Sequence, residues 1–190
     1  RCPNEHDLII EFMSFWTKNY PDVITGWNTD FFDIPYLANR IKQVCGEDKM
    51  RELSPWKNVS SKQIYSMGRN HLMYDIMGVS QYDYLQLYQK FTYTRQESYK
   101  LDYIASVELG EKKDENPYET FREWYENDFQ SFIDYNIQDV EIVDKLEDKM
   151  GLIDLALTMA YEGKVNYSDV FGQVKYWDIL IYNFLRKRKI

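Results

Sequence analysis

The sequence has few of the residues that bind soft metals or form disulfides. It contains two cysteines and two histidines, which are far apart in the chain and lack the spacing of metal ligands: Cys2, Cys45, His6 and His71. This scarcity argues against a zinc site, a Cys-His nucleophile and a disulfide framework. If the chain binds a metal, carboxylates must bind it, and that favours Mg²⁺ or Mn²⁺.

Long apolar runs are also missing. No segment approaches the ~20 apolar residues that a membrane span needs, so we expect no contact with a membrane. The first residues form neither the apolar core of a signal peptide nor an initiator methionine. We therefore expect a piece of a longer intracellular protein, located in the cytoplasm with its thiols reduced.

Positive charge is in deficit, whereas aromatic side chains are plentiful. Thirty-one acidic residues against 23 basic ones leave a formal net charge of −8. A protein that binds nucleic acid through bulk electrostatics is disfavoured, so any nucleic acid must be bound locally or through metal ions. Aromatic residues make up 17% of the 190 residues, which leaves stacking surfaces beyond those that the core needs.

The first third of the chain alternates helix and strand. Apolar residues recur at helical spacing from Asn4 to Tyr20, and the short apolar run 23–27 predicts a buried strand. A second helix is expected from Asp33, with Pro35 in its first turn and Gly46 after its end. This order is typical of an α/β layer fold.

The remainder predicts a β-hairpin followed by helices. Two β-leaning runs, 64–67 and 71–79, flank Gly68-Arg69-Asn70 and predict a hairpin over about 62–79. Short helices are expected over 84–91 and 101–109, and a solvated, charged loop over 111–117. From about residue 118 the chain predicts helices that break near Gly151 and Gly163.

One candidate site residue is Asp33, which follows the predicted strand and begins the next helix. In open α/β sheets, ligands bind at the carboxyl ends of the strands, where a carboxylate can face a metal while the sheet holds its backbone. The alternative is that Asp33 only caps its helix, a role for which aspartate is well suited.

A second candidate pair is Tyr135 and Asp139, which lie four residues apart and therefore on one face of a helix. Asp139 flanks the apolar stripe of this helix and is expected to be half-sheltered, as metal ligands often are. The alternative is a surface aspartate beside a tyrosine whose ring covers the edge of the core.

These two patterns resemble a known family when they are taken together. Asn28, Phe32 and Asp33 match Asn-x(2–3)-Phe/Tyr-Asp, and Tyr135 and Asp139 match Tyr-x(3)-Asp, the second and third motifs of the DEDDy 3′–5′ exonucleases. More closely, the chain resembles the proofreading exonuclease domain of family B DNA polymerases of the T-even-phage type. Several flanking segments carry that closer resemblance: 25–28, 34–36, 39–41, 88–91, 170–171 and 177–178.

The resemblance implies a fold and an arrangement of domains. It implies an RNase-H-like α/β exonuclease fold that lacks its first strands and carries an inserted β-hairpin and a helical C-terminal segment. Residues 1–150 would form the 3′–5′ exonuclease domain, and residues 151–190 would lead into the polymerase palm. The hairpin stands where these polymerases separate strands between their two active sites.

The resemblance also implies a function within a replicative DNA-directed DNA polymerase: hydrolysis of 3′-terminal nucleotides by two ions, Mg²⁺ or Mn²⁺. Asp33 would hold the ion near the leaving group and Asp139 the ion that carries the attacking water, which Tyr135 would orient. Asn28 and Phe32 would contact the single-stranded primer 3′ end. The implied partners are DNA and the remainder of the polymerase, in the cytoplasm of a host cell if a phage encodes it.

A middle segment, Tyr99 to Ile104, stands where the family has Ser/Thr-Leu-x-x-hydrophobic. By this match Lys100 and Leu101 would contact DNA. Lys100 replaces the usual Ser or Thr, which changes the expected contact, although a lysine can still reach a phosphate.

The sequence departs from the family at the first motif, Asp-x-Glu, which supplies the other two carboxylates. None of the acidic residues before Asp33 forms such a motif: Glu5, Asp7, Glu11, Asp22 and Asp30. Two carboxylates should bind a metal pair poorly, so we expect the chain to be inactive or nearly so alone. A sheet without its first strands also exposes a strand edge, which predicts self-association.

Two other functions stay open at this point. One is a non-catalytic module that binds single-stranded DNA or a partner protein, as in a split polymerase. The other is a standalone RNA-processing exonuclease of the same superfamily, which the hairpin and the palm-like C-terminal segment argue against.

Overall fold

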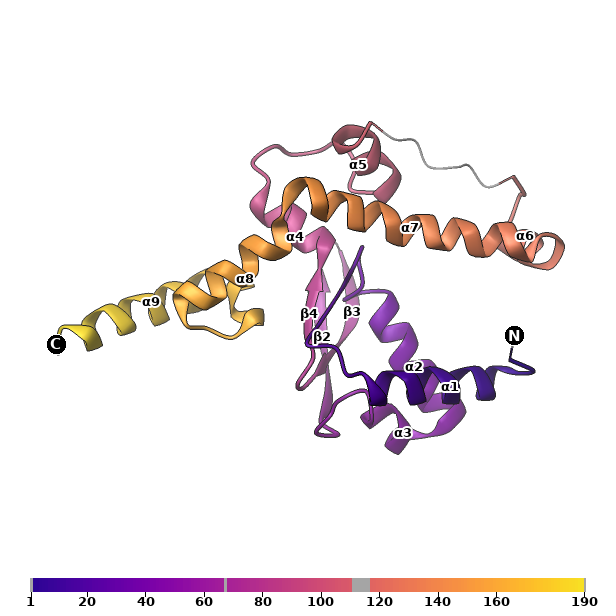
Figure 1. The fold of residues 1–190 in the computed structure, drawn as a ribbon, viewed down its shortest axis with the longest axis horizontal. Coiled ribbons are helices and arrows are strands. Elements are labelled where there is room, and N and C mark those ends of the chain that lie inside the picture. The colour runs from indigo at the N-terminus through magenta and orange to yellow at the C-terminus, as the bar shows by residue number, and fades with distance from the viewer. Residues whose placement is uncertain (1, 67, 111–116, 190) are drawn as a thin grey trace.

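The computed structural model describes residues 2–66, 68–110 and 117–189 (Figure 1). Met67, at the end of the first predicted β run, and residues 111–116 of the predicted charged loop lie outside the described residues. In chain order the elements are α1 (Glu5–Lys18), β1 (Val23–Gly26), α2 (Asp33–Cys45), α3 (Glu47–Arg51), β2 (Val59–Ser66), β3 (Arg69–Ile76), β4 (Ser80–Asp83), α4 (Tyr84–Phe91), α5 (Leu101–Glu108), α6 (Phe121–Asn127), α7 (Phe129–Met150), α8 (Leu152–Gly163), the 3₁₀ helix η1 (Tyr167–Phe171) and α9 (Gln173–Lys187). The predicted α/β class is confirmed.

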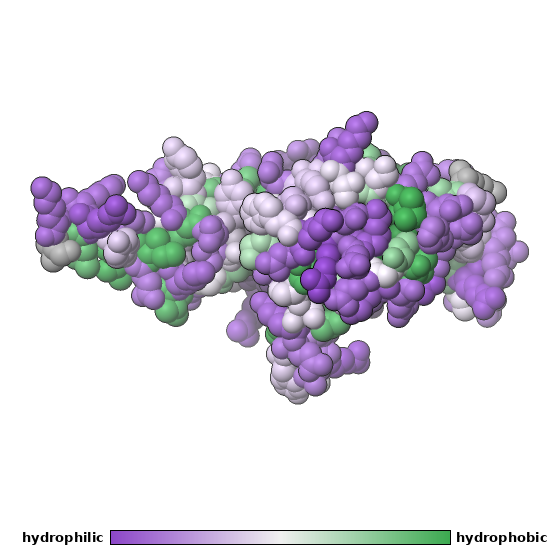
Figure 2. Space-filling view, turned by 90° about the horizontal axis from the view of Figure 1, so that it is seen from below, coloured by the Kyte–Doolittle hydropathy of each residue, from purple (hydrophilic) through white to green (hydrophobic). Residues whose placement is uncertain are grey.

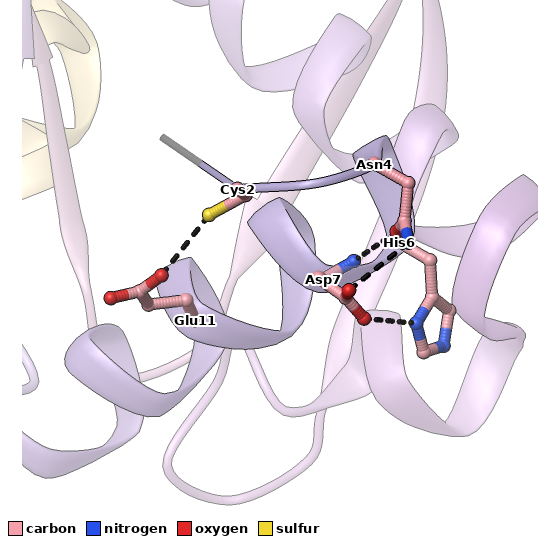
Figure 3. A network of polar contacts seen from close by, with 5 residues as sticks. All are labelled: Cys2, Asn4, His6, Asp7 and Glu11. Carbon is pink, nitrogen blue, oxygen red and sulfur yellow. Dashed lines mark hydrogen bonds and ion pairs between the residues drawn. The ribbon is translucent and has the colours of Figure 1, made fainter.

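Helix α1 begins where the sequence predicts. The side chain of Asn4 accepts a hydrogen bond from the backbone N–H of Asp7 at 2.9 Å, and its amide donates to the carboxylate of Asp7 (Figure 3). The Cys2 thiol donates to Glu11 one turn further along. Asn4 thus satisfies one of the free N–H groups of the first helical turn.

The strands form two separate pairs. Strand β1 pairs in parallel with β4, so that Val23 lies opposite Ser80 and Gly26 opposite Asp83. Strands β2 and β3 pair antiparallel over their full lengths. The strand predicted over 23–27 is confirmed, although its residues are half-buried or exposed and not buried as predicted. The β run predicted over 71–79 is confirmed as far as Ile76, where β3 ends.

A glycine makes the break between β3 and β4 possible. Gly78 has a φ of +92°, which side chains rarely adopt, and a Cβ there would lie 2.7 Å from Cγ of Pro55. The chain therefore turns at Gly78, and the four residues of β4 run beside β1 instead of continuing the hairpin.

Two groups of buried apolar residues hold the fold together. The larger one, which we call the strand-end core, joins β4, α4 and α5 to α7, α8 and η1; its buried members are Tyr82, Tyr84, Leu87, Tyr88, Ile104, Ala105, Ile142, Val143, Leu146, Leu152, Ala156, Ala160 and Val170. The second packs α1 and α2 against β3; its buried members are Ile9, Met13, Ile34, Ala38, Ile41, Met50, Leu53, Tyr74, Ile76 and Val79. The long helix α7 therefore shares a core with the strand pair and not with α1 and α2.

The last third of the chain is helical, as predicted. Gly151, in the left-handed conformation with φ +61°, separates α7 from α8, and α8 ends at Gly163. Helix α9 has no buried residue among those described and extends from the body as an arm (Figure 1). Its exposed apolar side chains include Val174, Trp177, Ile181 and Phe184, and green apolar patches lie among purple hydrophilic residues on this arm in Figure 2. No helix in the described part of the chain is both long and apolar enough to cross a membrane.

Candidate active site at the strand ends

The candidate site is built where β1 and β4 end. Because the two strands are parallel and Gly26 lies opposite Asp83, both chains leave the sheet at the same edge. The chain after β1 forms a loop, residues 27–32, and enters α2 at Asp33, while the chain after β4 enters α4 directly. Two helices thus begin side by side at the edge where α/β sheets bind ligands.

Short-range contacts fix the shape of this loop, which we call the motif loop (residues 28–32). Asn28 adopts a φ of +64°, a left-handed conformation that asparagine tolerates better than most residues. The N–H of Phe32 donates to the carbonyl oxygen of Asn28 at 3.1 Å. A Cβ at Gly26 would lie 2.6 Å from the methyl group of Thr29, so only glycine lets the loop fold back this closely.

A buried carboxylate ties the motif loop to α4. Asp83 is 1% exposed, and its Oδ1 accepts hydrogen bonds from the backbone N–H groups of Asn28 at 2.9 Å and Leu85 at 3.0 Å. Its Oδ2 accepts from the N–H of Asp30 at 3.3 Å. Burial raises the pKa of Asp83 and these N–H donors oppose that rise. One side chain therefore caps α4 and holds two peptide groups of the loop.

Asp30, in the middle of the motif loop, is a second buried acid, 5% exposed. Its Oδ2 accepts a hydrogen bond from the side-chain amide of Gln86 at 2.8 Å. Burial, and then the nearby carboxylate of Asp83, raise the pKa of Asp30 from its ordinary value of 3.8 to about 6. Its other oxygen, Oδ1, is buried without a hydrogen-bond partner. Protonation of Asp30 is therefore accessible in mildly acidic solution.

Asp33 does not cap α2. The N-cap is Phe32, no side chain bonds to the free N–H groups there, and Asp33 is the first helical residue. The interpretation of Asp33 as only a helix cap is therefore wrong. Asp33 is exposed at the edge of the site. Partial desolvation nevertheless raises the pKa of its carboxyl group, the hydrogen bond from its own backbone N–H lowers it, and the negative charge of Asp83 raises it further. A negative charge at the first turn of a helix is itself favourable.

The structure brings the predicted middle segment to the motif loop. The indole N–H of Trp27, the residue before Asn28, donates to the carbonyl oxygen of Tyr99 at 3.1 Å. Lys100 follows, exposed at the start of α5, whereas Leu101 packs against the strand-end core. Phe32 is 66% exposed on the loop.

Tyr135 and Asp139 lie one turn apart on α7 and are both half-buried, as predicted for Asp139. One carboxylate oxygen of Asp139, Oδ1, is buried. Asp139 lies on the same face as Val143, which belongs to the strand-end core against which Trp27 packs. The face of α7 that carries Asp139 therefore also carries Val143, a buried member of this core.

Rings hold Tyr135 in place. The centroid of the Tyr135 ring lies 4.8 Å from that of Trp124 and 6.1 Å from that of Phe121, both on α6. Trp124 is 2% exposed, and Phe132 meets it edge-on at 6.0 Å. Helix α6 begins with a capping box at Thr120, in which the Thr120 side chain and the Glu123 side chain bond reciprocally to backbone N–H groups of the first turn.

The described residues do not contain a complete metal site. Within residues 2–66, 68–110 and 117–189, no group of three or more His, Cys, Asp or Glu side chains is arranged to hold a metal ion. Asp33 and Asp139 are carboxylates of the chemistry that Mg²⁺ or Mn²⁺ prefers. Helix α2, which begins at Asp33, packs in the core with α1 and β3, whereas α7, which carries Asp139, packs in the strand-end core. Two carboxylates fit part of such a site.

A family model described as "DNA polymerase family B, exonuclease domain" matches residues 1–104. The chain belongs to the family B DNA polymerases. The match contains the motif loop, Asp33 and Asp83, which are the parts of this exonuclease domain that meet at the strand ends.

Relatives of this exonuclease domain include two phage enzymes. The chain is 40% identical over 187 residues to a DNA-directed DNA polymerase of Escherichia phage RB69, which covers 97% of this chain and 20% of that protein. It is also 40% identical over 184 residues to a DNA-directed DNA polymerase of Enterobacteria phage T4, with 96% and 20% covered. The predicted resemblance to T-even-type polymerases is thus confirmed, and the chain spans about a fifth of the length of these relatives.

A more distant relative is the DNA polymerase delta catalytic subunit of Candida albicans, which is 35% identical over 118 residues. The aligned part covers 58% of this chain and 11% of that protein.

Reasoning from the sequence missed the two buried acids of this exonuclease domain. Asp83 stands directly before the helical pattern of α4, a position typical of an N-cap, and this signal could have found it. Nothing in the sequence marks Asp30 as buried, because its burial depends on contacts with β4 and α4, which lie more than 50 residues further along the chain.

Proposed function

We propose that this chain is the proofreading part of a replicative DNA-directed DNA polymerase and hydrolyses the 3′-terminal nucleotides of DNA when the rest of the polymerase is present. One observation carries the proposal. The motif loop and Asp33 stand at the carboxyl ends of two parallel strands, and α7, which bears Tyr135 and Asp139, packs in the same core as Tyr82 of β4 and Tyr84 of α4. This shared core supports a single site for motifs about a hundred residues apart.

Metal binding follows from the donor set. Asp33 and Asp139 would hold the divalent ions, Mg²⁺ or Mn²⁺, together with further carboxylates that the described residues do not provide. When bound, two such ions lower the pKa of a water molecule, neutralise the phosphate and stabilise the departing 3′ oxygen. Because this chain supplies only part of the ligand set, we expect weak metal binding and little or no hydrolysis by the chain alone.

The residues around the two carboxylates would orient the reactants. The phenol of Tyr135, one helical turn from Asp139, would hold the attacking water by a hydrogen bond. Tyrosine is too weak an acid, with an ordinary pKa of about 10, to serve as the main base. Its packing against Trp124 supports a positioning role, because a ring held on one side leaves its hydroxyl few directions.

The DNA 3′ end would lie over the motif loop. Phe32, 66% exposed, is free to pack against a base or sugar, an interaction worth ~1–3 kcal/mol per base that tolerates any sequence. Asn28 would contribute a polar contact and Lys100 a phosphate contact. Leu101 would act from its place against the strand-end core, by fixing the backbone that carries Lys100.

The remainder of the polymerase would complete the domain. In this proposal residues 1–150 form an RNase-H-like exonuclease domain with an inserted hairpin at about 62–79, and residues 151–190 lead into the palm. The exposed apolar side chains of α9 support a further part of the polymerase as their cover. The phage relatives support the cytoplasm of a host cell as the place of action.

A single experiment tests the hydrolytic function. The purified chain is incubated with a 5′-labelled single-stranded DNA oligonucleotide, in Mg²⁺, in Mn²⁺ and in chelator, beside Asp139→Ala. The matched control is Asp144→Ala, since Asp144 is an exposed acid on the same helix. We expect the chain to bind the oligonucleotide in the presence of the metal tightly enough to shift its mobility on a native gel. We expect no shortening of the oligonucleotide.

Each other outcome has a distinct meaning. Metal-dependent 3′–5′ shortening that Asp139→Ala abolishes and Asp144→Ala leaves intact would show that other carboxylates complete the site, for example from a second chain. Absence of oligonucleotide binding under all conditions would contradict the proposal. A preference for RNA 3′ ends would favour an RNA-processing exonuclease.

A non-catalytic module for single-stranded DNA or a partner protein is the second candidate. The absence of a three-ligand metal group from the described residues favours it. Binding that is the same in Mg²⁺ and in chelator would support this module, whereas the exonuclease function predicts metal-dependent binding.

A further inference from the structure

We propose that Asp83 is a positioning residue for the nucleic-acid strand, because it fixes the motif loop in the shape that presents Asn28, Phe32 and Asp33. This inference rests on the proposed function. Asp83 touches neither the substrate nor a metal in this proposal and acts through the loop.

The hydrogen bonds of Asp83 determine two successive parts of the loop. Its carboxylate receives the N–H groups of Asn28 at 2.9 Å and Asp30 at 3.3 Å, so the Trp27–Asn28 and Thr29–Asp30 peptide groups both point at one buried side chain. This arrangement holds Asn28 in its left-handed conformation, which most residues avoid. The loop cannot reverse either peptide group without leaving a buried carboxylate oxygen unsatisfied.

The same carboxylate connects the loop to a rigid part of the fold. Asp83 also receives the N–H of Leu85 in the first turn of α4, and α4 contributes Tyr84, Leu87 and Tyr88 to the strand-end core. The core therefore determines where the loop lies. A residue that only capped α4 would need the bond to Leu85 alone, and not the bonds to Asn28 and Asp30.

A second contact ties the same loop to the same helix. Gln86 of α4 donates from its amide to Asp30 at 2.8 Å. Thus two side chains, those of Asp83 and Gln86, reach from the β4–α4 side to the motif loop. The loop is held at Asn28 and Asp30, and Phe32 and Asp33 follow within three residues.

Two substitutions separate helix capping from loop positioning. Asp83→Ser keeps a side-chain oxygen that can cap α4, but this oxygen is too short to reach the loop. Asp83→Asn keeps one oxygen for Asn28 and Leu85 and presents an N–H₂ group to the N–H of Asp30. The matched control is Asp169→Asn, because Asp169 is a buried acid that accepts the N–H of Asn166 and pairs with Lys175 outside the site.

Two quantities are measured for each variant. Amide hydrogen exchange is followed at Asn28, Asp30 and Leu85, and the affinity for a 5′-fluorescein-labelled ten-nucleotide single-stranded DNA is measured in Mg²⁺. In Asp83→Ser we expect exchange at Asn28 and Asp30 to be faster and exchange at Leu85 to stay close to the wild-type rate. Affinity should fall about tenfold, because the loop loses two of the hydrogen bonds that fix its shape.

The other two variants provide an intermediate case and a control. Asp83→Asn should speed exchange mainly at Asp30 and weaken binding less than Asp83→Ser. Asp169→Asn should lower the stability of the fold without changing either the exchange at the loop or the affinity. A structural role alone would lower stability in all three variants and leave the affinity of the folded protein unchanged.

Three results would overturn the inference. In the first, Asp83→Ser speeds exchange at Leu85 alone. In the second, the loop amides exchange faster while the affinity stays at the wild-type value. In the third, the wild-type chain does not bind the oligonucleotide, which removes the proposed function and this inference with it; that failure is seen before any variant is compared.

Discussion

The two halves of the candidate site are held by different forces. At the strand ends, buried carboxylates and backbone N–H groups fix the motif loop through directional hydrogen bonds. On α7, packed rings hold Tyr135, with Trp124 at the centre of the group. Helices α4 and α7, which carry parts of the two halves, both contribute buried residues to the strand-end core.

The difference determines what each half is sensitive to. Hydrogen bonds to buried acids depend on charge and protonation, because an unsatisfied or wrongly charged group in the interior is costly. Ring packing depends on volume and shape and hardly on pH. The strand-end half should therefore respond to pH and to isosteric substitutions, and the α7 half to truncation.

Truncation of Trp124 should have the largest effect. Trp124→Ala removes a ring that is 2% exposed, and we expect a loss of about 3–5 kcal/mol in the free energy of unfolding. Denaturant unfolding followed by circular dichroism measures this loss. Trp56→Ala, which truncates a ring that is 68% exposed, is the control and should change stability little. If Trp124→Ala were as mild as Trp56→Ala, ring packing would not be what holds the α7 half.

Removal of the Asp30 carboxyl group should change how the free energy of unfolding depends on pH. This effect tests the pH sensitivity expected of the strand-end half. Because the folded pKa is about 6 against an ordinary value of 3.8, the folded state binds the proton more tightly than the unfolded state does. The stabilising contribution of protonated Asp30 is complete below about pH 4 and is lost as the pH rises through 6, by about 3 kcal/mol. Asp30→Asn should lack this loss.

The measurement is the free energy of unfolding from pH 4 to 8 for the wild type and Asp30→Asn. The difference between the two curves reports Asp30, because the other titrating groups are common to both. Parallel curves would contradict the raised pKa. The same difference should persist in the Trp124→Phe background, since the α7 half has no part in it.

Self-association should give the smallest effect. In the described part of the chain β1 has β4 as its strand partner, so its other edge exposes backbone groups that can pair with a second copy. Exposed apolar residues on α7, including Val140 at 70% exposed, offer a second surface for association. Val140→Lys should weaken the association by about 1 kcal/mol, as measured by sedimentation over a concentration series.

The control for this prediction is Tyr161→Lys on α8, where the ring is 81% exposed. A wild-type chain that stays a monomer at high concentration would contradict the prediction. Equal effects of the two substitutions would mean that general surface charge, and not the α7 face, governs the association.

The sequence was sufficient to predict elements with strong local signals. Asn4 before an amphipathic pattern predicts the start of α1, and Gly151 and Gly163 predict the breaks between the last helices, because capping and backbone freedom are local properties. It was not sufficient for β4, whose four residues carry no periodicity and whose place beside β1 depends on the turn at Gly78.

The candidate site was also predicted only in part. The motif residues Asp33, Tyr135 and Asp139 could be named from their spacing, but their supporting residues could not. Trp124 and Asp83 act through contacts made only in the folded chain, and the role of Asp33 as first helical residue instead of cap depends on the conformation of Phe32. Spacing reveals which groups carry the chemistry, and tertiary contacts decide what holds them.

The left-handed backbone at Asn28 has a consequence for scanning mutagenesis. Replacing Asn28 with alanine would remove an amide and also force a poorly tolerated backbone angle, with φ at +64°, so a lost activity could be misassigned to a lost DNA contact. Asn28→Gly removes the amide while it relieves the backbone, and Asn28→Asp keeps a residue that accepts this angle while it changes the charge. Read as a pair, these two substitutions separate what the side chain recognises from what the main chain requires.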